Sequence, residues 1–199
     1  MAPAEEWSLT GLVGTEAAMA HVSPQALPEA YNQVAETTNG YLVATLPLAD
    51  GTPRFELWSR NDVSDAGVRH MPGAAWRLTE IQSGLTTLSQ ETVGAYIPLN
   101  LNLHAIDGVS FTKGCYTGQE VIARMHHLGQ LKKSLFRLEA TFTDSTPEIG
   151  DPLVDEDGGK LGSITDCIAT EAGDCHVLAV LSHKAMAATV TLADQPGAR

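Results

Sequence analysis

A thiol, a positive charge and a predicted helix start lie within residues 113–120, whose sequence is KGCYTGQE. Cys115 carries the thiol, and the ammonium group of Lys113 lies two residues before it. Thr117 and Glu120 have the spacing of a capping box, which predicts that a helix begins at Thr117. The positive end of that helix and the Lys113 ammonium both favour thiolate over thiol. The octapeptide therefore predicts a reactive cysteine, with the alternative that Cys115 is a small buried hydrophobe in a turn.

A second candidate site lies in residues 75–84, where Trp76 is followed by the charged residues Arg77 and Glu80. An aromatic ring beside charges can flank a flat heteroaromatic ligand, because such a ligand stacks on the ring and bonds to nearby polar groups. The run 75–81 is also expected to form a strand, and an aromatic residue on a strand commonly belongs to the core. Residue types alone leave both interpretations of Trp76 open.

The sequence does not predict a metal site. His126 and His127 are neighbours, and adjacent residues on a helix diverge by roughly 100°, so they do not share a face. The three cysteines lack metal-ligand spacing, and three thiolates cannot complete the usual shell of an iron–sulfur cluster. We expect no stably bound metal.

Charge and composition limit the classes of partner. The 199 residues, 43% of them hydrophobic, are enough for one large or two small domains, and the net charge of −12 opposes general binding to nucleic acid or anionic membranes. Five of the twelve Lys and Arg residues nevertheless lie in residues 113–137, with Glu120 as the one acid among them. This segment either forms a positive face or, as the simpler interpretation, solvates a helix end and a strand.

Localisation follows from the absence of targeting signals. Glu5 and Glu6 stand where a secretory signal has basic residues, and no apolar stretch approaches the length of a membrane span. We expect a cytoplasmic protein without membrane contact.

The elements that must position these residues form an α+β pattern. Strands are predicted at 8–13, 41–46 and 54–59, with a helix at 15–22 and a turn at 50–53, in a mostly antiparallel sheet. Residues 97–104 are expected to be an extended segment or a turn that packs against this sheet.

After residue 129 the pattern changes to short strands, predicted at 133–142, 160–168, 176–181 and 189–192. Such spacing is typical of a small β-barrel or sandwich. The predicted domains are therefore 1–129, which ends with the octapeptide and its helix, and 130–199.

The octapeptide, with residues 108–111 before it and 122–124 after it, closely resembles the signature of the YgfZ-type folate-binding proteins, relatives of the glycine-cleavage T-protein. The resemblance runs from about Trp7 to the C-terminal strands. It implies a folate-binding α+β module followed by a β-barrel, with tetrahydrofolate or a derivative as the ligand. It also implies support of iron–sulfur cluster assembly or repair, and thereby of tRNA modification.

The resemblance also implies roles for single residues. Cys115 is the candidate reactive group and Lys113 tunes its charge, while the same motif contains Tyr116, Gln119 and Glu120. Trp76 aligns with a Trp that contacts folate, and Arg77 and Glu80 have weaker claims. Arg124 is placed to meet a polyglutamate tail. The implied partners are folate and iron–sulfur enzymes, including tRNA-modifying enzymes, with weak or indirect contact to tRNA.

Family members carry a further N-terminal segment, so we expect this chain to be N-terminally incomplete and to bind folate more weakly than a full-length protein. Two alternatives remain. A folate-dependent aminomethyltransferase of the glycine-cleavage type shares the architecture, but it lacks this octapeptide and uses an acid that this chain does not contain. The other alternative is a non-enzymatic module that docks tRNA or a protein through the basic segment 113–137. We therefore expect a transferase-like fold without the usual aminomethyltransferase activity.

Overall fold

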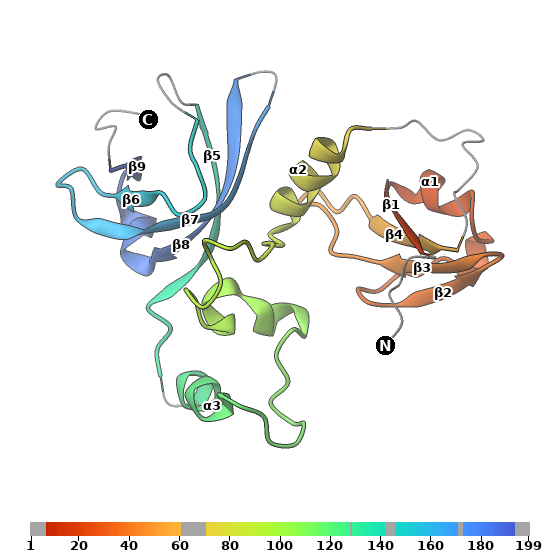
Figure 1. Ribbon diagram of the computed structural model, residues 1–199, viewed down its shortest axis with the longest axis horizontal. Helices are drawn as coiled ribbons and strands as arrows, with labels where there is room; N and C mark the ends of the chain where they lie inside the picture. The colour runs from red at the N-terminus through yellow and green to blue at the C-terminus, as the bar shows by residue number, and fades with distance from the viewer. Residues whose placement is uncertain (1–6, 61–70, 128, 142–145, 171–172, 194–199) are drawn as a thin grey trace. The chain divides into compact units, whose positions relative to one another are not determined.

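The computed structural model describes residues 7–60, 71–127, 129–141, 146–170 and 173–193. Its strands form two antiparallel sheets accompanied by short helices (Figure 1), which confirms the predicted α+β class. The chain divides into two compact units, Met1–Ser83 and Gly84–Arg199, and each sheet belongs to one of them. The domain boundary expected between residues 129 and 130 stays a prediction.

The first sheet has four strands in the order β1-β4-β3-β2, and all neighbours are antiparallel. These strands are β1 (Ser8–Val13), β2 (Val34–Thr37), β3 (Gly40–Ala44) and β4 (Arg54–Ser59). β1 and β4 have the predicted bounds, whereas β2 was not predicted. The turn expected at 50–53 is confirmed by the Leu48 N–H, which donates to the Thr52 carbonyl at 2.9 Å.

Side chains alternate between the two faces of this sheet, and one face carries the apolar cluster of the unit. Leu12 and Phe55 are opposite each other on β1 and β4 and pack with Ala18 of α1 (Thr15–Met19), a helix shorter than predicted. Gly11 and Arg54 alternate with these residues, so they lie on the opposite face of the sheet.

The strand predicted at 75–81 is wrong, because these residues lie in helix α2 (Gly73–Ser83). The segment is rich in Ala, Leu, Arg and Glu, which favour a helix. Its residues 76, 79 and 83 share one face at helical spacing, and the side chains at all three positions contact Arg54 of β4. These contacts with the sheet outweigh the strand preference of the Trp, Thr and Ile residues.

The second sheet has five strands in the order β5-β8-β7-β6-β9, again with antiparallel neighbours. They are β5 (Lys133–Thr141), β6 (Pro152–Val154), β7 (Lys160–Ala169), β8 (Asp174–Ser182) and β9 (Thr191–Leu192). The strands predicted in this region correspond to β5, β7, β8 and β9, although Phe142 lies outside the described residues. The three-residue β6 was not predicted. Closure of the sheet into a barrel stays a prediction.

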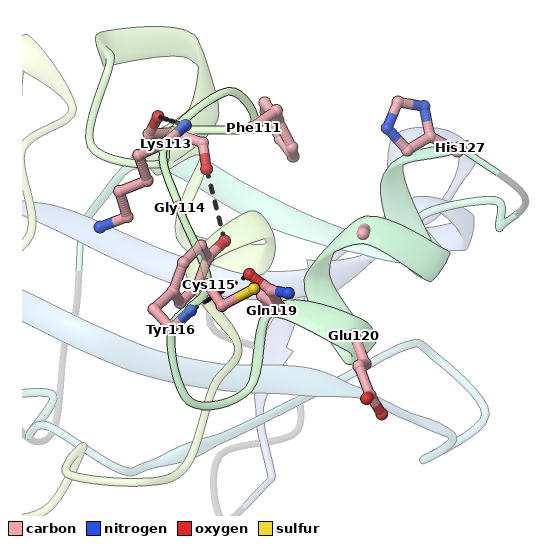
Figure 2. A pocket seen from close by; sticks show the side chains of 10 residues that line it. Phe111, Lys113, Gly114, Cys115, Tyr116, Gln119, Glu120 and His127 are labelled. Atoms are coloured by element: carbon pink, nitrogen blue, oxygen red, sulfur yellow. Dashed lines mark hydrogen bonds between the residues drawn. The ribbon is translucent and has the colours of Figure 1, made fainter.

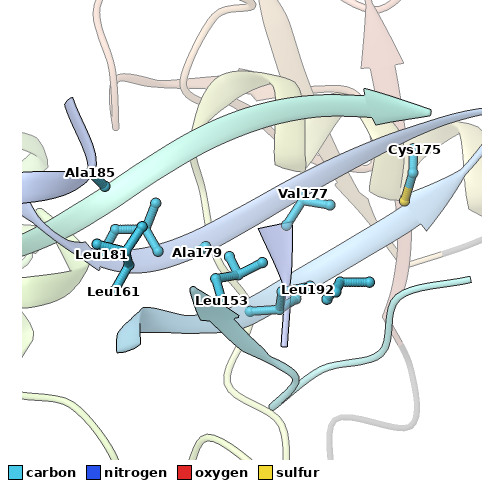
Figure 3. Packing of buried hydrophobic residues seen from close by; sticks show 9 residues of the cluster. Leu153, Leu161, Cys175, Val177, Ala179, Leu181, Ala185 and Leu192 are labelled. Carbon is cyan, nitrogen blue, oxygen red and sulfur yellow. The ribbon is translucent and has the colours of Figure 1, made fainter. Parts of the chain in front are cut away.

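The apolar cluster of the second unit lies along β7 and β8 (Figure 3). Leu161, Val177 and Leu181 are buried there, and Leu153 of β6 and Leu192 of β9 pack against them. Strand β8 is buried almost along its whole length, which agrees with its position between β5 and β7.

Of the extended segment or turn expected at 97–104, the extended alternative is wrong. Two 3₁₀ helices, Pro98–Leu101 and Leu103–Ile106, occupy it, separated by Asn102 at a φ of +56°. Proline fixes a φ compatible with a helix start, and Asn tolerates the left-handed region, so the sequence contains the signals for this shape. The segment packs on β5, because the Asn100 and Asn102 side-chain amides donate to the Lys133 and Leu135 carbonyls at 3.0 and 2.9 Å. The expected packing against the first sheet stays a prediction.

Candidate functional site

An open depression of about 380 Å³ lies between the loop 110–116 and helix α3 (Gln119–His127), as Figure 2 shows. Four residues of the helix line it, and Gln119, Ala123 and His127 among them have a spacing that places them on one side of α3, beside Glu120. The remaining lining residues are Ser110, Phe111, Lys113, Gly114, Cys115 and Tyr116. The structure therefore gathers all the octapeptide residues predicted for the site around one pocket.

The helix after the octapeptide begins at Gln119, two residues later than predicted. Gly118 precedes it at a φ of +87°, and its carbonyl accepts the Ile122 N–H at 3.4 Å, so Gly118 acts as the N-cap. The preceding turn is closed by Gln119, whose side-chain oxygen accepts the Tyr116 N–H at 3.1 Å and whose own N–H donates to the Tyr116 carbonyl at 3.2 Å. A capping box from Thr117 is wrong because this glycine turn separates Thr117 from the helix.

The loop before the helix is held by Ser110 and Tyr116. The Ser110 hydroxyl accepts the Lys113 N–H at 3.1 Å, and the Tyr116 hydroxyl donates to the Ser110 carbonyl at 3.5 Å. The Lys113 ammonium lies 4.6 Å from the centroid of the Tyr116 ring, a cation–π contact. In Figure 2 the Lys113 and Cys115 side chains leave the loop in different directions, so tuning of the thiol by Lys113 stays a prediction.

The three cysteines differ in burial. Cys115 is exposed, so it is not the small buried hydrophobe of the alternative interpretation. Cys167 is half-buried and donates its thiol to the Pro147 carbonyl at a Sγ···O distance of 3.1 Å. Cys175 is buried, and burial raises the pKa of its thiol, which keeps it protonated at neutral pH. Accessibility therefore singles out Cys115.

We expect iodoacetamide to alkylate Cys115 before Cys167 and Cys175 in the folded protein at neutral pH, because the reagent needs an accessible thiolate. Mass spectrometry of peptides from a time course measures the order. A Lys113→Met variant, which keeps most of the apolar stem, tests whether the ammonium accelerates the reaction. Faster labelling of Cys167 or Cys175 than of Cys115 would contradict the prediction.

Trp76, Arg77 and Glu80 lie on α2, in the unit Met1–Ser83, whereas the pocket belongs to the unit Gly84–Arg199. Trp76 is half-buried, Arg77 is exposed and Glu80 is half-buried. The Arg54 guanidinium lies 4.2 Å from the centroid of the Trp76 ring. A Cβ on Gly11 would clash with the Trp76 ring atom Cε3, so the ring can take this position only because residue 11 is a glycine.

The described residues contain no group of three or more His, Cys, Asp and Glu side chains arranged to hold a metal ion. Within the same residues, no helix combines the length and apolar character that crossing a membrane requires.

Comparison with known proteins finds relatives named tRNA-modifying protein YgfZ, although no family model matches the chain. The tRNA-modifying protein YgfZ of Yersinia pseudotuberculosis is 30% identical over 98% of this chain, and that of Colwellia psychrerythraea is 38% identical over 55% of it. This chain is homologous to the YgfZ-type proteins. The matched part spans 64% of the Yersinia relative and 35% of the Colwellia relative.

The YgfZ-type homology confirms the resemblance inferred from the octapeptide, and the structure adds residues that the sequence analysis missed. His127 and Ala123 line the pocket because they follow Gln119 at helical spacing, a signal that was available in the sequence. Arg54 and Gly11 surround Trp76 through strand pairing and helix packing, for which the sequence has no local signal. Arg124 is exposed on α3 and does not belong to the residues that line the pocket.

Proposed function

We propose that this protein binds tetrahydrofolate or a derivative, supports the assembly or repair of iron–sulfur clusters, and thereby takes part in tRNA modification. Its homology to tRNA-modifying YgfZ proteins over 98% of its length is the observation that carries the proposal. Its place of action would be the cytoplasm, where thiols such as that of the exposed Cys115 stay reduced.

The folate part of the proposal rests on Trp76. A pterin is flat and polar at its edges, so it suits an aromatic ring with charged neighbours. Trp76 is half-buried with part of its surface accessible, and Arg77 and Glu80 are on the same helix. These residue types fit the ligand: the ring supplies stacking area and the charged groups supply hydrogen bonds.

The octapeptide pocket supplies the reactive group in this proposal. Cys115 is an exposed thiol at the wall of an open depression, which suits contact with a large partner such as an iron–sulfur enzyme. Tyr116 and Gln119 fix the loop through their paired hydrogen bonds, and Glu120 lines the same wall. Arg124, exposed on the following helix, is available for a folate tail or an acidic partner surface.

The two alternatives differ from this proposal in measurable ways. An aminomethyltransferase would turn over a glycine-derived group, for which the octapeptide thiol offers no explanation. A docking module for tRNA would use the exposed Arg124, Lys132 and Lys133, but the net charge of −12 opposes strong binding to a polyanion. We therefore propose weak or indirect contact with tRNA.

A calorimetric titration with tetrahydrofolate tests the proposal, using protein expressed from the complete gene. We expect saturable binding of tetrahydrofolate, and only weak binding of tRNA that disappears steeply as salt is raised, because phosphate contacts release counterions. Lack of folate binding would remove the folate part of the proposal. Tight tRNA binding with a steep salt dependence would favour the docking module instead.

A further inference from the structure

A buried arginine lies where α2 meets the first sheet. Arg54 begins β4 and is 1% exposed. Its Nε donates to the Thr79 hydroxyl at 2.9 Å, and its Nη1 donates to the Ser83 hydroxyl at 3.0 Å and to the Leu46 carbonyl at 3.2 Å. The guanidinium therefore joins the strand to two successive turns of α2.

Among the described residues, one end of this guanidinium has no hydrogen-bond partner. The Nη2 atom of Arg54 is buried and makes no hydrogen bond to any residue that the structure describes. Burial lowers the pKa of the Arg54 side chain, and the charges of Glu80 and Glu56 oppose that effect. Leaving a buried N–H of a charged group unsatisfied costs free energy, so such groups in native proteins require an explanation.

The unpartnered group lies beside the candidate aromatic residue. The Cζ atom of Arg54 is 4.2 Å from the centroid of the Trp76 ring, and Gly11 leaves the space that the ring occupies. Gly11 and Arg54 lie on the same face of the sheet, because Gly11 pairs with Glu56, two residues after Arg54. The ring is thus supported from the sheet, while Trp76 as a whole is only half-buried.

From this geometry we propose that Arg54 determines the specificity of a ligand site at Trp76, with its Nη2 N–H donating to an acceptor oxygen of a planar ligand bound at the edge of the ring. The proposal rests on the proposed folate function and deepens it, since a reduced pterin carries a ring oxygen and its tail carries carboxylates. Because Nη2 is buried in this structure, the ligand must displace the protein atoms that cover it. Binding should therefore also change the surroundings of the Trp76 indole.

The test compares Arg54→Lys with Ser83→Ala in protein expressed from the complete gene. Lys keeps the charge but lacks Nη2, whereas Ser83→Ala removes one acceptor of Nη1 and leaves Nη2 intact. Calorimetry uses tetrahydrofolate and tetrahydropterin, which lacks the tail. We expect Arg54→Lys to weaken binding about tenfold to a hundredfold, the range for a hydrogen bond to a charged group, and Ser83→Ala to leave affinity nearly unchanged.

Loss with both ligands would place the acceptor on the pterin ring, and loss with tetrahydrofolate alone would place it on the tail. If the wild type binds and Arg54→Lys binds equally well, the proposal for Arg54 is overturned while the folate proposal stands. If the wild type binds neither ligand, both proposals fall.

A second measurement covers the case in which Arg54→Lys does not fold. In ¹⁵N-labelled wild type, tetrahydrofolate should shift the Trp76 indole N–H signal, assigned by its loss in Trp76→Phe, and the guanidinium signal of Arg54. An unchanged guanidinium signal at saturation would overturn the proposal.

Discussion

Cys115→Ala should fold normally and yet fail to restore iron–sulfur enzyme activities and cluster-dependent tRNA thiolation in a strain that lacks the gene. The thiol is exposed, so its removal should change the free energy of unfolding by no more than about 0.5 kcal/mol. The loss of function would then come from chemistry at the pocket rather than from instability. Enzyme assays of the extracts and mass spectrometry of the thiolated tRNA nucleosides measure the effect.

Cys167→Ala is the matched control, because it removes a half-buried thiol far from the pocket in sequence and should restore the activities. Glycine cleavage should be unaffected in all strains. Full complementation by Cys115→Ala would assign the octapeptide a role through its backbone shape alone. A defect confined to glycine cleavage would instead favour the aminomethyltransferase.

Trp76→Ala should weaken tetrahydrofolate binding by about 1 to 3 kcal/mol, the range found when stacking of a base on an aromatic side chain is lost. The structure adds a second expectation. Removing the ring also removes the cation–π partner of the buried Arg54, so the variant should unfold at a lower temperature. Calorimetric titration measures the affinity, and thermal unfolding followed by circular dichroism measures the stability.

Trp76→Phe separates these two effects, because Phe keeps an aromatic face above Arg54 and Gly11. It should retain much of the affinity and most of the stability. If Trp76→Ala is less stable but binds tetrahydrofolate as tightly as the wild type, Trp76 belongs to the core of its unit and not to a ligand site.

The strands were predictable where one apolar face alternates with a polar one. In β4, Phe55 and Leu57 alternate with Arg54 and Glu56 in that pattern, and the bounds of the strand agree with the prediction. α2 was mistaken for a strand because Trp76, Thr79 and Ile81 have high strand preference, while the contacts that stabilise the helix come from Arg54, more than twenty residues earlier in the chain. Long-range packing of this kind leaves no local signal.

The candidate site residues also divide into those that a local sequence pattern indicates and those that are positioned by long-range packing. The octapeptide was recognisable as a candidate site because its residues are contiguous, and a thiol between glycines before a helix is a local pattern. The hydrogen bonds of the turn before α3 were not predictable. The side chains of Gln119 and Thr117 can both accept a hydrogen bond from a backbone amide, and in the structure Gln119 does so next to Gly118, which has a positive φ. The surroundings of Trp76 depend on the pairing of β1 with β4, which the sequence does not encode locally.

The side chains of Asn100 and Asn102 have a consequence for self-association. β5 stands at one end of the second sheet, and the outer carbonyls of such a strand are a template on which a strand from another molecule can pair. The two amides occupy the Lys133 and Leu135 carbonyls, alternate positions on that outer side. A strand from a second copy would have to displace both of them, so the first residues of β5 are protected from intermolecular sheet growth by the chain's own preceding segment.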